Sequence, residues 1–332
     1  MSASWAPLYV VRLRLAKYGA YKINMRQYSP LTILAYGLGP TLILFSHCGA
    51  LLILTTGISW GAIAWAVGWY GIRMLATTAI YHRLLTHNSY RAPKLVLWVG
   101  CLVGAAAGQM GPSWWKAHHL AHHQHSDQAV DAHSPCRPLP GVNKIYWSQG
   151  GWLFSRWFFP AKLPVDVEQD PFLRRLDRVH FMPLVALCLL SYGIGGVEYF
   201  GAFCLSTTLL FHGVQTVNSL CHLVGQQPFR TGDNSRNNAL VAVLTLGEGW
   251  HNLHHAIAHS SRHGITLQNG KVTYLPDPTF QFIRLLERVS LASRLHLPTE
   301  QSLLKRANDS NQLGQAARPQ RESPKPQLSA NR

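Results

Sequence analysis

The feature that most constrains this chain is an uncharged stretch, Leu31–Tyr70, with Arg73 as the first charged residue after it. A helix from 31 to 56 alone would be about 39 Å long, which exceeds the roughly 30 Å hydrocarbon core of a membrane. The stretch therefore predicts two membrane-spanning helices, at about 31–56 and 59–81, with a turn near Gly57–Gly61. Arg73 would lie late in the second helix, where it faces the protein or reaches towards the interface.

A second apolar block runs from about 182 to 220, and a helix of that length would be about 58 Å long. That length fits two crossings, at about 182–197 and 199–220, with a turn near Gly195–Glu198. The run at about 94–112 is interrupted by glycines and a glutamine, so we expect a helix that lies in the membrane interface. The pattern predicts an all-α integral membrane protein with four transmembrane helices.

Charged residues are scarce in this chain, and basic ones outnumber acidic ones. It carries 30 Lys and Arg against 14 Asp and Glu, a formal net charge of +16, and 13% of its residues are charged. Soluble proteins usually carry about 25%, so the composition argues against an ordinary cytosolic enzyme, and the apolar blocks argue against a nucleic-acid-binding protein. We divide the chain into a basic cytosolic segment at 1–30, a membrane domain at 31–304 and a disordered tail at 305–332.

Eighteen histidines outnumber the acidic residues, and eight of them fall in three windows: His82–His87, His119–His123 and His251–His255. In the last two windows the spacing i, i+3, i+4 puts imidazoles on one face of a helix. The i, i+5 spacing of the first window does not, so we expect the helix to end or unwind between His82 and His87. Imidazole binds iron, zinc, copper or nickel, and eight ligands suit two metal ions.

The three windows lie in longer motifs that resemble the membrane-bound fatty-acid desaturases. These motifs are Tyr81–Tyr90, Trp115–Asp127 and Gly247–His255, and the likeness extends from about Trp60 to Pro298. The pattern is similar to the acyl-CoA Δ9, stearoyl-CoA-like branch of bacterial and cyanobacterial type. The resemblance implies four transmembrane helices under a cytosolic helical cap, in a bacterial-type cell membrane, with the termini and the active site on the cytoplasmic side.

The resemblance also implies a histidine-rich centre that holds two Fe²⁺ ions. Its nine ligands would be His82, His87, His119, His122, His123, His222, His251, His254 and His255. His222 comes from the resemblance alone, and Asn218 matches the residue that holds a water beside one iron. Next to the ligands we place four further candidates: His118, His125, Asp127 and Glu248. The remaining histidines are assigned no metal role: His47, His133, His180, His212, His259, His263 and His296.

The activity implied is oxygen-dependent removal of two hydrogens from adjacent carbons of a saturated acyl chain, which leaves a cis double bond at Δ9. Two electrons would come from a separate donor of the ferredoxin or cytochrome b5 type. Ala117, His118 and Leu120 stand where animal acyl-CoA enzymes place charged residues. The carrier of the acyl chain therefore stays open among coenzyme A, acyl carrier protein and a membrane lipid.

Other functions fit the same scaffold. A hydroxylase, an acetylenase or an alkene-forming oxygenase could use the same histidines on the same kind of chain. A membrane metal-binding or transport protein would need more polar residues inside the spans than the sequence offers. Chain length, exact double-bond position, oligomeric state and the role of the tail are left open by the sequence.

Overall fold

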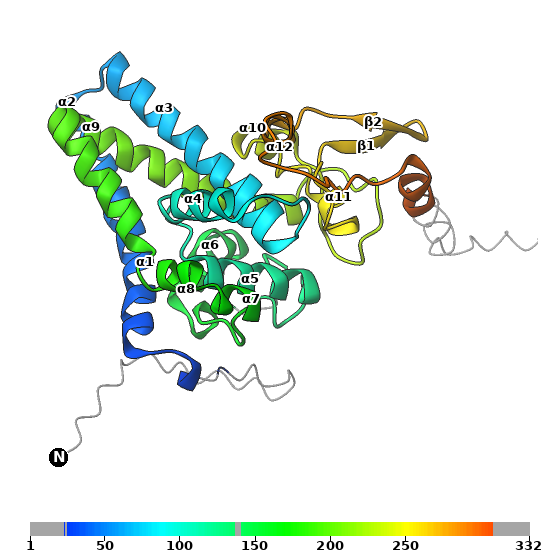
Figure 1. Ribbon diagram of the computed structural model, residues 1–332, viewed down its shortest axis with the longest axis horizontal. Coiled ribbons are helices and arrows are strands. Elements are labelled where there is room, and N and C mark those ends of the chain that lie inside the picture. The colour runs from blue at the N-terminus through cyan, green and yellow to red at the C-terminus, as the bar shows by residue number, and fades with distance from the viewer. Residues whose placement is uncertain (1–22, 24, 137–140, 308–332) are drawn as a thin grey trace, which may run out of the picture.

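The computed structural model describes residues 23, 25–136 and 141–307, which fold into helices and one short β-hairpin (Figure 1). The α-helices are α1 (Pro30–Ala50), α2 (Ile53–Thr56), α3 (Trp60–Leu75), α4 (Lys94–Ala105), α5 (Pro112–His125), α6 (Lys144–Gln149), α7 (Val165–Gln169), α8 (Pro171–Arg178), α9 (Phe181–Ser219), α10 (Ala239–Leu244), α11 (His251–Ala256) and α12 (Pro278–Arg288). The other elements are η1 (Met25–Gln27), η2 (Ala76–Thr86), η3 (Gly151–Phe154), η4 (Arg156–Phe158), η5 (Leu220–His222), β1 (Ile265–Gln268) and β2 (Lys271–Tyr274). The described chain is predominantly helical, as expected.

Each apolar block contains a long helical stretch. Among the described residues, Pro30–Thr56 and Phe181–His222 are long and apolar enough to cross a membrane. The second stretch is kinked, because Gly195 and Gly196 leave the helical conformation. Gly196 takes a φ of +61°, a left-handed value that favours glycine. The kink lies where the sequence predicts a turn, and it divides α9 into two limbs.

The apolar helices pack on one another through α9, which contacts both α1 and α3 (Figure 1). Small side chains allow a close approach, since Ala62 and Ala66 of α3 are buried against Ala202 of α9. The Ser59 hydroxyl starts α3 by accepting a hydrogen bond from the N–H of Ala62. These contacts form one bundle, from which the histidine-bearing segments extend.

Arg73, the charged residue late in α3, lies inside the protein with 0% of its surface exposed. Its guanidinium donates hydrogen bonds to the carbonyl of Ala106 (3.2 Å) and to the hydroxyls of Ser206 (2.8 Å) and Thr207 (2.7 Å). These acceptors come from the end of α4 and from α9. The buried arginine therefore ties three helices together, and of its two predicted positions it takes the one facing the protein.

The helix α5, which carries the second histidine window, is anchored at its first turn. The backbone N–H groups of Ser113 and Trp114 donate to the carboxylate of Asp177 in α8, at 2.8 and 3.3 Å. The hydroxyl of Tyr36 in α1 donates to the same carboxylate at 2.7 Å. This shared acceptor satisfies the free N–H groups of the α5 start and fixes α5 against α1 and α8.

The predicted interfacial helix at about 94–112 is shorter in the structure. It ends with α4, and the glycine-containing residues that follow form a turn before α5 begins. Leu95, Val99 and Leu102 of α4 are exposed apolar residues. Spaced at i, i+4 and i+7, they lie along one side of the helix.

The prediction of an all-α fold is wrong at one place, where β1 and β2 form an antiparallel hairpin with Ile265 opposite Tyr274. Asn269 and Gly270 make the two-residue turn, with φ values of 51° and 75°. An Asn-Gly pair favours this geometry, because both central residues of such a turn need a positive φ.

The two predicted terminal segments are described only in part. Residues 300–307 are helical and include the first three residues of the predicted tail. The rest of the tail, at 308–332, lies outside the described residues, as do residues 1–22 and 24 of the predicted basic segment.

Candidate metal centre

The first histidine window begins on η2, a π-helix that continues α3, and it ends at His87, the residue directly after η2. In such a helix each N–H bonds to the carbonyl five residues earlier, and the N–H of His87 donates to the carbonyl of His82 at 3.2 Å. Five residues carry an α-helix about 140° past a whole turn, whereas the wider turn brings position i+5 back towards position i. The helix therefore widens after His82, and it ends at Thr86, between the two histidines, which is one of the two outcomes that the spacing predicts.

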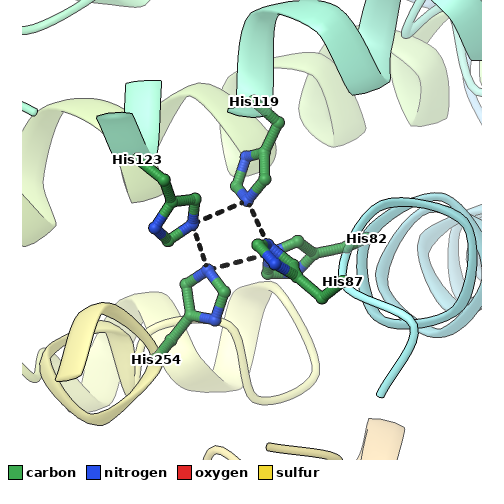
Figure 2. A group of neighbouring side chains, drawn as sticks. All are labelled: His82, His87, His119, His123 and His254. Carbon is green, nitrogen blue, oxygen red and sulfur yellow. Dashed lines mark hydrogen bonds between the residues drawn. The ribbon is translucent and has the colours of Figure 1, made fainter. Parts of the chain in front are cut away.

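Five of the nine predicted ligands lie together in one cluster, which we call the five-histidine cluster (Figure 2). Its members are His82, His87, His119, His123 and His254. They come from the end of η2 and the residue that follows it, from α5 and from α11, and Figure 2 shows their rings converging on one point. Facing Nε2 atoms lie 2.8 to 3.0 Å apart, so the rings surround a space of atomic size.

The other four predicted ligands form the four-histidine cluster: His122, His222, His251 and His255. The Nε2 atom of His222, in η5, lies 3.1 Å from that of His251. The helices α5 and α11 each serve both clusters. In each of these helices the i, i+4 histidine pair faces one cluster and the third histidine faces the other.

Carboxylates hold three imidazoles of the four-histidine cluster. The Nδ1 atoms of His122, His222 and His255 lie 2.8, 3.0 and 2.6 Å from the carboxylates of Asp131, Asp127 and Asp233, respectively. A carboxylate only accepts hydrogen bonds, so each Nδ1 carries a proton and each Nε2 turns its lone pair towards the cluster.

Sequence reasoning found one of these three carboxylates, Asp127, and missed the other two. Asp131 follows Asp127 by four residues, in the turn directly after the second histidine window. Its closeness to that window in the sequence could have identified Asp131 as a partner of one of the histidines. Asp233 lies far from every histidine window in the sequence, and no local pattern distinguishes it.

A single carboxylate, that of Glu248, backs the five-histidine cluster. It lies 2.6 Å from Nδ1 of His82 and 3.1 Å from Nδ1 of His263. Arg83 donates to the same carboxylate at 2.9 Å and to both oxygens of Asp277 at 3.0 Å. His263, which the sequence treats as structural, is therefore part of a buried ionic network behind the cluster.

Burial keeps most of the clustered imidazoles neutral. It lowers the pKa of His119, His123 and His254 well below the usual range, and the neighbouring imidazoles lower these pKa values further. Burial also acts to lower the pKa of His122, but the carboxylate of Asp131 more than offsets this and raises it. In return, His122 helps to hold the pKa of Asp131 at about 2 despite the opposing effect of burial.

The arrangement fits bound metal cations. The Nε2 atoms of His122 and His255 are buried without a hydrogen-bond partner, and their Nδ1 protons are already engaged by carboxylates. Unprotonated nitrogens that face one another at close range repel unless a cation lies between them. Imidazole binds such a cation at about 2.0–2.1 Å, and the nine imidazoles fit two cations from the iron, zinc, copper and nickel group.

The remaining candidates lie in different places. The Nδ2 atom of Asn218 donates to Oε1 of Gln215 at 3.3 Å, and Asn218 lines two cavities that also reach the clusters. His118 instead donates from Nε2 to the carbonyl of Phe158 at 3.1 Å. His125 lies at the end of α5, where it lines a separate surface groove.

Two narrow cavities of about 40 Å³ each meet beside the clusters. The first, named the Met110 cavity, is lined by parts of α1, α5 and α9. The second, named the Thr78 cavity, extends to Met74 in α3 and also touches Glu248. The two cavities share four wall residues: Trp115, His119, Val214 and Asn218. The two cavities are therefore neighbours beside the histidines, and we refer to them together as the passage.

Known proteins resemble this chain over most of its length. An acyl-CoA 5-desaturase of Anemone leveillei is 34% identical over 249 residues, which cover 71% of this chain and 74% of the relative. The sn-1 stearoyl-lipid 9-desaturase of Anabaena variabilis is 35% identical over 256 residues, which cover 75% of this chain and 91% of the relative. A chloroplastic palmitoyl-monogalactosyldiacylglycerol delta-7 desaturase of Arabidopsis thaliana is 33% identical over 250 residues, which cover 73% and 64%.

These relatives share a chemistry but differ in the position that their names specify, at carbons 5, 9 and 7. Residues 58–263 match the fatty acid desaturase family. The likeness therefore identifies the family and the class of reaction without singling out the Δ9 branch that the sequence motifs suggest. The chain belongs to the fatty acid desaturase family, whose members are oxidoreductases.

Proposed function

We propose that this protein is a di-iron, oxygen-dependent desaturase that inserts a cis double bond, at Δ9, into a saturated fatty acyl chain. The observation that carries the proposal is the pair of histidine clusters beside a narrow apolar passage. In this proposal one Fe²⁺ binds in each cluster, and Asn218 holds a water beside one of them. Asn218 suits this role because it shares a cavity wall with His119 and His251.

The passage accounts for positioning of the substrate. An extended acyl chain lying through the Met110 and Thr78 cavities would pass His119 and Asn218. Its walls would hold two adjacent methylene groups near the clusters and exclude water from them. No side chain in these walls is assigned the role of a general acid or base.

When bound, the two irons would supply the oxidation that removes two hydrogens from the chain, with dioxygen, two external electrons and two protons from the solvent consumed and two waters formed. The electrons would come from a ferredoxin or a cytochrome b5-type donor, which the basic surface could attract. The contribution of Asp127, Asp131 and Asp233 is to hold protons on the Nδ1 atoms of their histidine partners. Each Nε2 then stays available as a ligand.

The proposal includes four transmembrane helices within a membrane domain at 31–304. They are α1 with α2, α3 with the start of η2, and the two limbs of α9. Four crossings would leave both termini and both histidine clusters on the cytoplasmic side, in agreement with the positive-inside rule. The Δ9 assignment is supported by the motifs and by the name of the Anabaena relative.

Fatty-acid profiling in an expressing host tests the proposal, with the double-bond position read by mass spectrometry. The wild type should raise cis-Δ9 acyl chains, and His122→Ala should abolish the rise and lower the iron content. His259→Ala is the matched control, because His259 is exposed and lies outside both clusters. Hydroxylated or triple-bonded chains without new cis alkenes would instead support the alternative oxygenases, and a double bond elsewhere would overturn only the Δ9 assignment.

A further inference from the structure

The helix α8 presents three arginines on one side. Arg174, Arg175 and Arg178 are all exposed, and their side chains leave the helix axis within about 100° of one another. The opposite side of α8 is buried through Leu173 and Leu176. The helix is therefore amphipathic, with a positively charged outer face that we call the arginine face.

No carboxylate neutralises the arginine face. Among the described residues, none of its three arginines forms an ion pair. The carboxylates nearest in the sequence are engaged elsewhere: Asp166 with Lys116, Glu168 with Ser113, Asp170 with the N–H groups of Phe172 and Leu173, and Asp177 with the first turn of α5. Arg178 lies four residues after Arg174 and three after Arg175, so these like charges repel along the helix. A bound anion would relieve that repulsion.

An exposed apolar surface adjoins the arginine face. Phe172, at the edge of this face, stacks on Trp98 of α4 with the ring centroids 5.2 Å apart. Beside Trp98, Leu95 and Val99 of α4 are 68% and 53% exposed, and Leu102 continues the same side of the helix. Cationic and apolar side chains therefore form one continuous surface. We call it the α4–α8 surface: Leu95, Val99, Leu102, Phe172, Arg174, Arg175 and Arg178.

The α4–α8 surface lies beside the start of a membrane-length helix. The helix α9 begins at Phe181, three residues after Arg178, and 181–222 is long and apolar enough to cross a membrane. The helix α4 packs against α9 as well as against α8. Cationic residues directly before a membrane span attract the anionic headgroups of the cytoplasmic leaflet. The arginine face is therefore placed at headgroup level.

An anionic phospholipid matches both parts of this surface. Its phosphate accepts paired hydrogen bonds from the planar guanidinium of arginine, and its acyl chains cover exposed apolar side chains. A free phosphate ion would leave the apolar part in water. A zwitterionic lipid carries a cation next to its phosphate, so it is attracted more weakly to three arginines.

Asp177 connects the α4–α8 surface to the metal centre. It lies on the buried side of α8, where its carboxylate accepts hydrogen bonds from the N–H groups of Ser113 and Trp114 at the start of α5. It also accepts one from the hydroxyl of Tyr36 in α1. Because α5 carries the second histidine window, the position of α8 affects the position of histidines in both clusters.

We propose that the α4–α8 surface binds an anionic phospholipid, with the headgroup on the arginine face and the acyl chains along α4. The bound lipid holds α8 in place and, through Asp177, the start of α5. The inference uses the proposed membrane crossing of α9 and does not depend on the reaction at the metal centre.

Photocrosslinking to lipid tests the binding site. The full-length, iron-loaded protein is placed in phosphatidylcholine nanodiscs with a trace of phosphatidylglycerol that carries a diazirine on its acyl chain. Phosphatidylcholine with the same diazirine chain is the matched probe. We expect phosphatidylglycerol to label peptides from 94–105 and 171–182 about tenfold more than phosphatidylcholine does. Equal labelling by the two probes would overturn the proposal.

Substitution of the arginines tests the role of charge. One variant combines Arg174→Gln, Arg175→Gln and Arg178→Gln, and it should fold normally because all three side chains are exposed and form no ion pair. It should label equally with the two probes. In the wild type, about 1 M NaCl should have the same effect, because it screens charges more than about 3 Å apart. A preference for phosphatidylglycerol that survives both changes would contradict the role of the arginine face.

A second variant controls for total charge. It carries glutamine in place of three exposed arginines outside α4 and α8: Arg230, Arg288 and Arg294. This variant should keep the preference for phosphatidylglycerol, and an equal loss in both variants would overturn the proposal in favour of a general effect of net charge. If the α8 variant instead loses binding to an acidic ferredoxin and keeps its lipid label, the surface serves a protein partner and the proposal is wrong.

Hydrogen–deuterium exchange tests the connection to α5. In the wild type, phosphatidylglycerol in the nanodisc should slow amide exchange in the peptide 112–118 about threefold, because the start of α5 opens less often. The α8 variant should show no such change, and unchanged exchange in the wild type would overturn the connection. Neither readout measures product. A protein that binds the lipid here but makes no double bond would therefore contradict the proposed function alone.

Discussion

The five-histidine and four-histidine clusters lie side by side on the same two helices, yet they are supported differently. The smaller cluster has three carboxylates on its imidazoles, from Asp127, Asp131 and Asp233. The larger has one, from Glu248, which is shared with His263 and neutralised further by Arg83. The cluster with fewer neutral ligands is thus the one with more negative charge behind it.

This difference teaches that the number of ligands alone does not describe the two sites. Carboxylates behind imidazoles increase ligand basicity and fix ring orientation. A cation in the four-histidine cluster has one imidazole ligand fewer, and the nearby carboxylates would compensate by electrostatic attraction. A cation in the five-histidine cluster would depend on the imidazoles themselves.

Removing one histidine from each cluster should give the largest difference between the two sites. His251→Ala leaves three imidazoles in its cluster, so the purified protein should hold one iron per chain instead of two. His254→Ala leaves four in the other cluster and should retain two irons with weaker binding. Desaturation should fall at least about 100-fold in both. Equal iron loss in the two variants, measured by elemental analysis, would mean that the clusters do not differ in this way.

The ionic network behind the larger cluster should matter mainly for stability. Arg83→Met leaves the buried carboxylates of Glu248 and Asp277 without their cation, which should cost about 3–5 kcal/mol of folding free energy. Arg284→Met removes an exposed partner of Glu287 and should cost less than about 1 kcal/mol. Thermal unfolding in detergent compares the two. Similar melting temperatures for both variants would contradict the structural role of the network.

Loss of a single carboxylate tests the smaller cluster. Asp131→Asn keeps the shape of the side chain but removes the charge beside His122, so iron affinity of the four-histidine cluster should fall about 10–100-fold. The five-histidine cluster, which Asp131 does not contact, should keep its iron. Competition with a graded series of chelators measures both affinities. Equal weakening of the two irons would show that the carboxylate acts on the whole centre.

A histidine outside both clusters separates metal effects from ordinary acid sensitivity. Burial lowers the pKa of His180 to about 4, whereas an unfolded histidine titrates near 6.5. Between these values the unfolded chain binds a proton that the folded chain does not, so stability falls with acidification. The expected loss is about 2 kcal/mol between pH 7 and pH 5. His180→Phe should remove this part of the pH dependence of thermal unfolding without changing the iron content at pH 7. An unchanged pH profile would assign the acid sensitivity to other groups.

The sequence predicted which nine histidines gather, because eight of them lie in windows whose spacing is local and the ninth matches a family motif. It could not predict how they divide, since that depends on how α5 and α11 are turned relative to η2 and η5. Asp233 was missed for a related reason. It reaches His255 only through the folding of a loop that has no repeating pattern.

Secondary structure was predictable where the sequence has long apolar runs or clear helix-breaking residues. Long apolar runs and a pair of glycines predicted the helices α1, α3 and α9 and the kink at Gly195–Gly196. The hairpin was missed although Asn269-Gly270 is a strong turn signal, because its strands are only four residues each. The π-helix was missed because all of its residues are buried, polar ones included, so no division into an exposed polar face and a buried apolar face reveals its period.

Because Ala76–Thr86 is a π-helix, the directions of the His82 and His87 side chains depend more on the number of residues in this segment than on their identity. Shortening this segment by one residue would favour the ordinary α-helical turn, and each residue then contributes about 100° of rotation. His82 and His87 would no longer point to one place even if both were retained. Substitutions that preserve length can be absorbed by repacking, whereas a one-residue deletion changes the angular phase between a membrane helix and the metal centre. The number of residues in this segment therefore constrains the site more strongly than the identity of most of them.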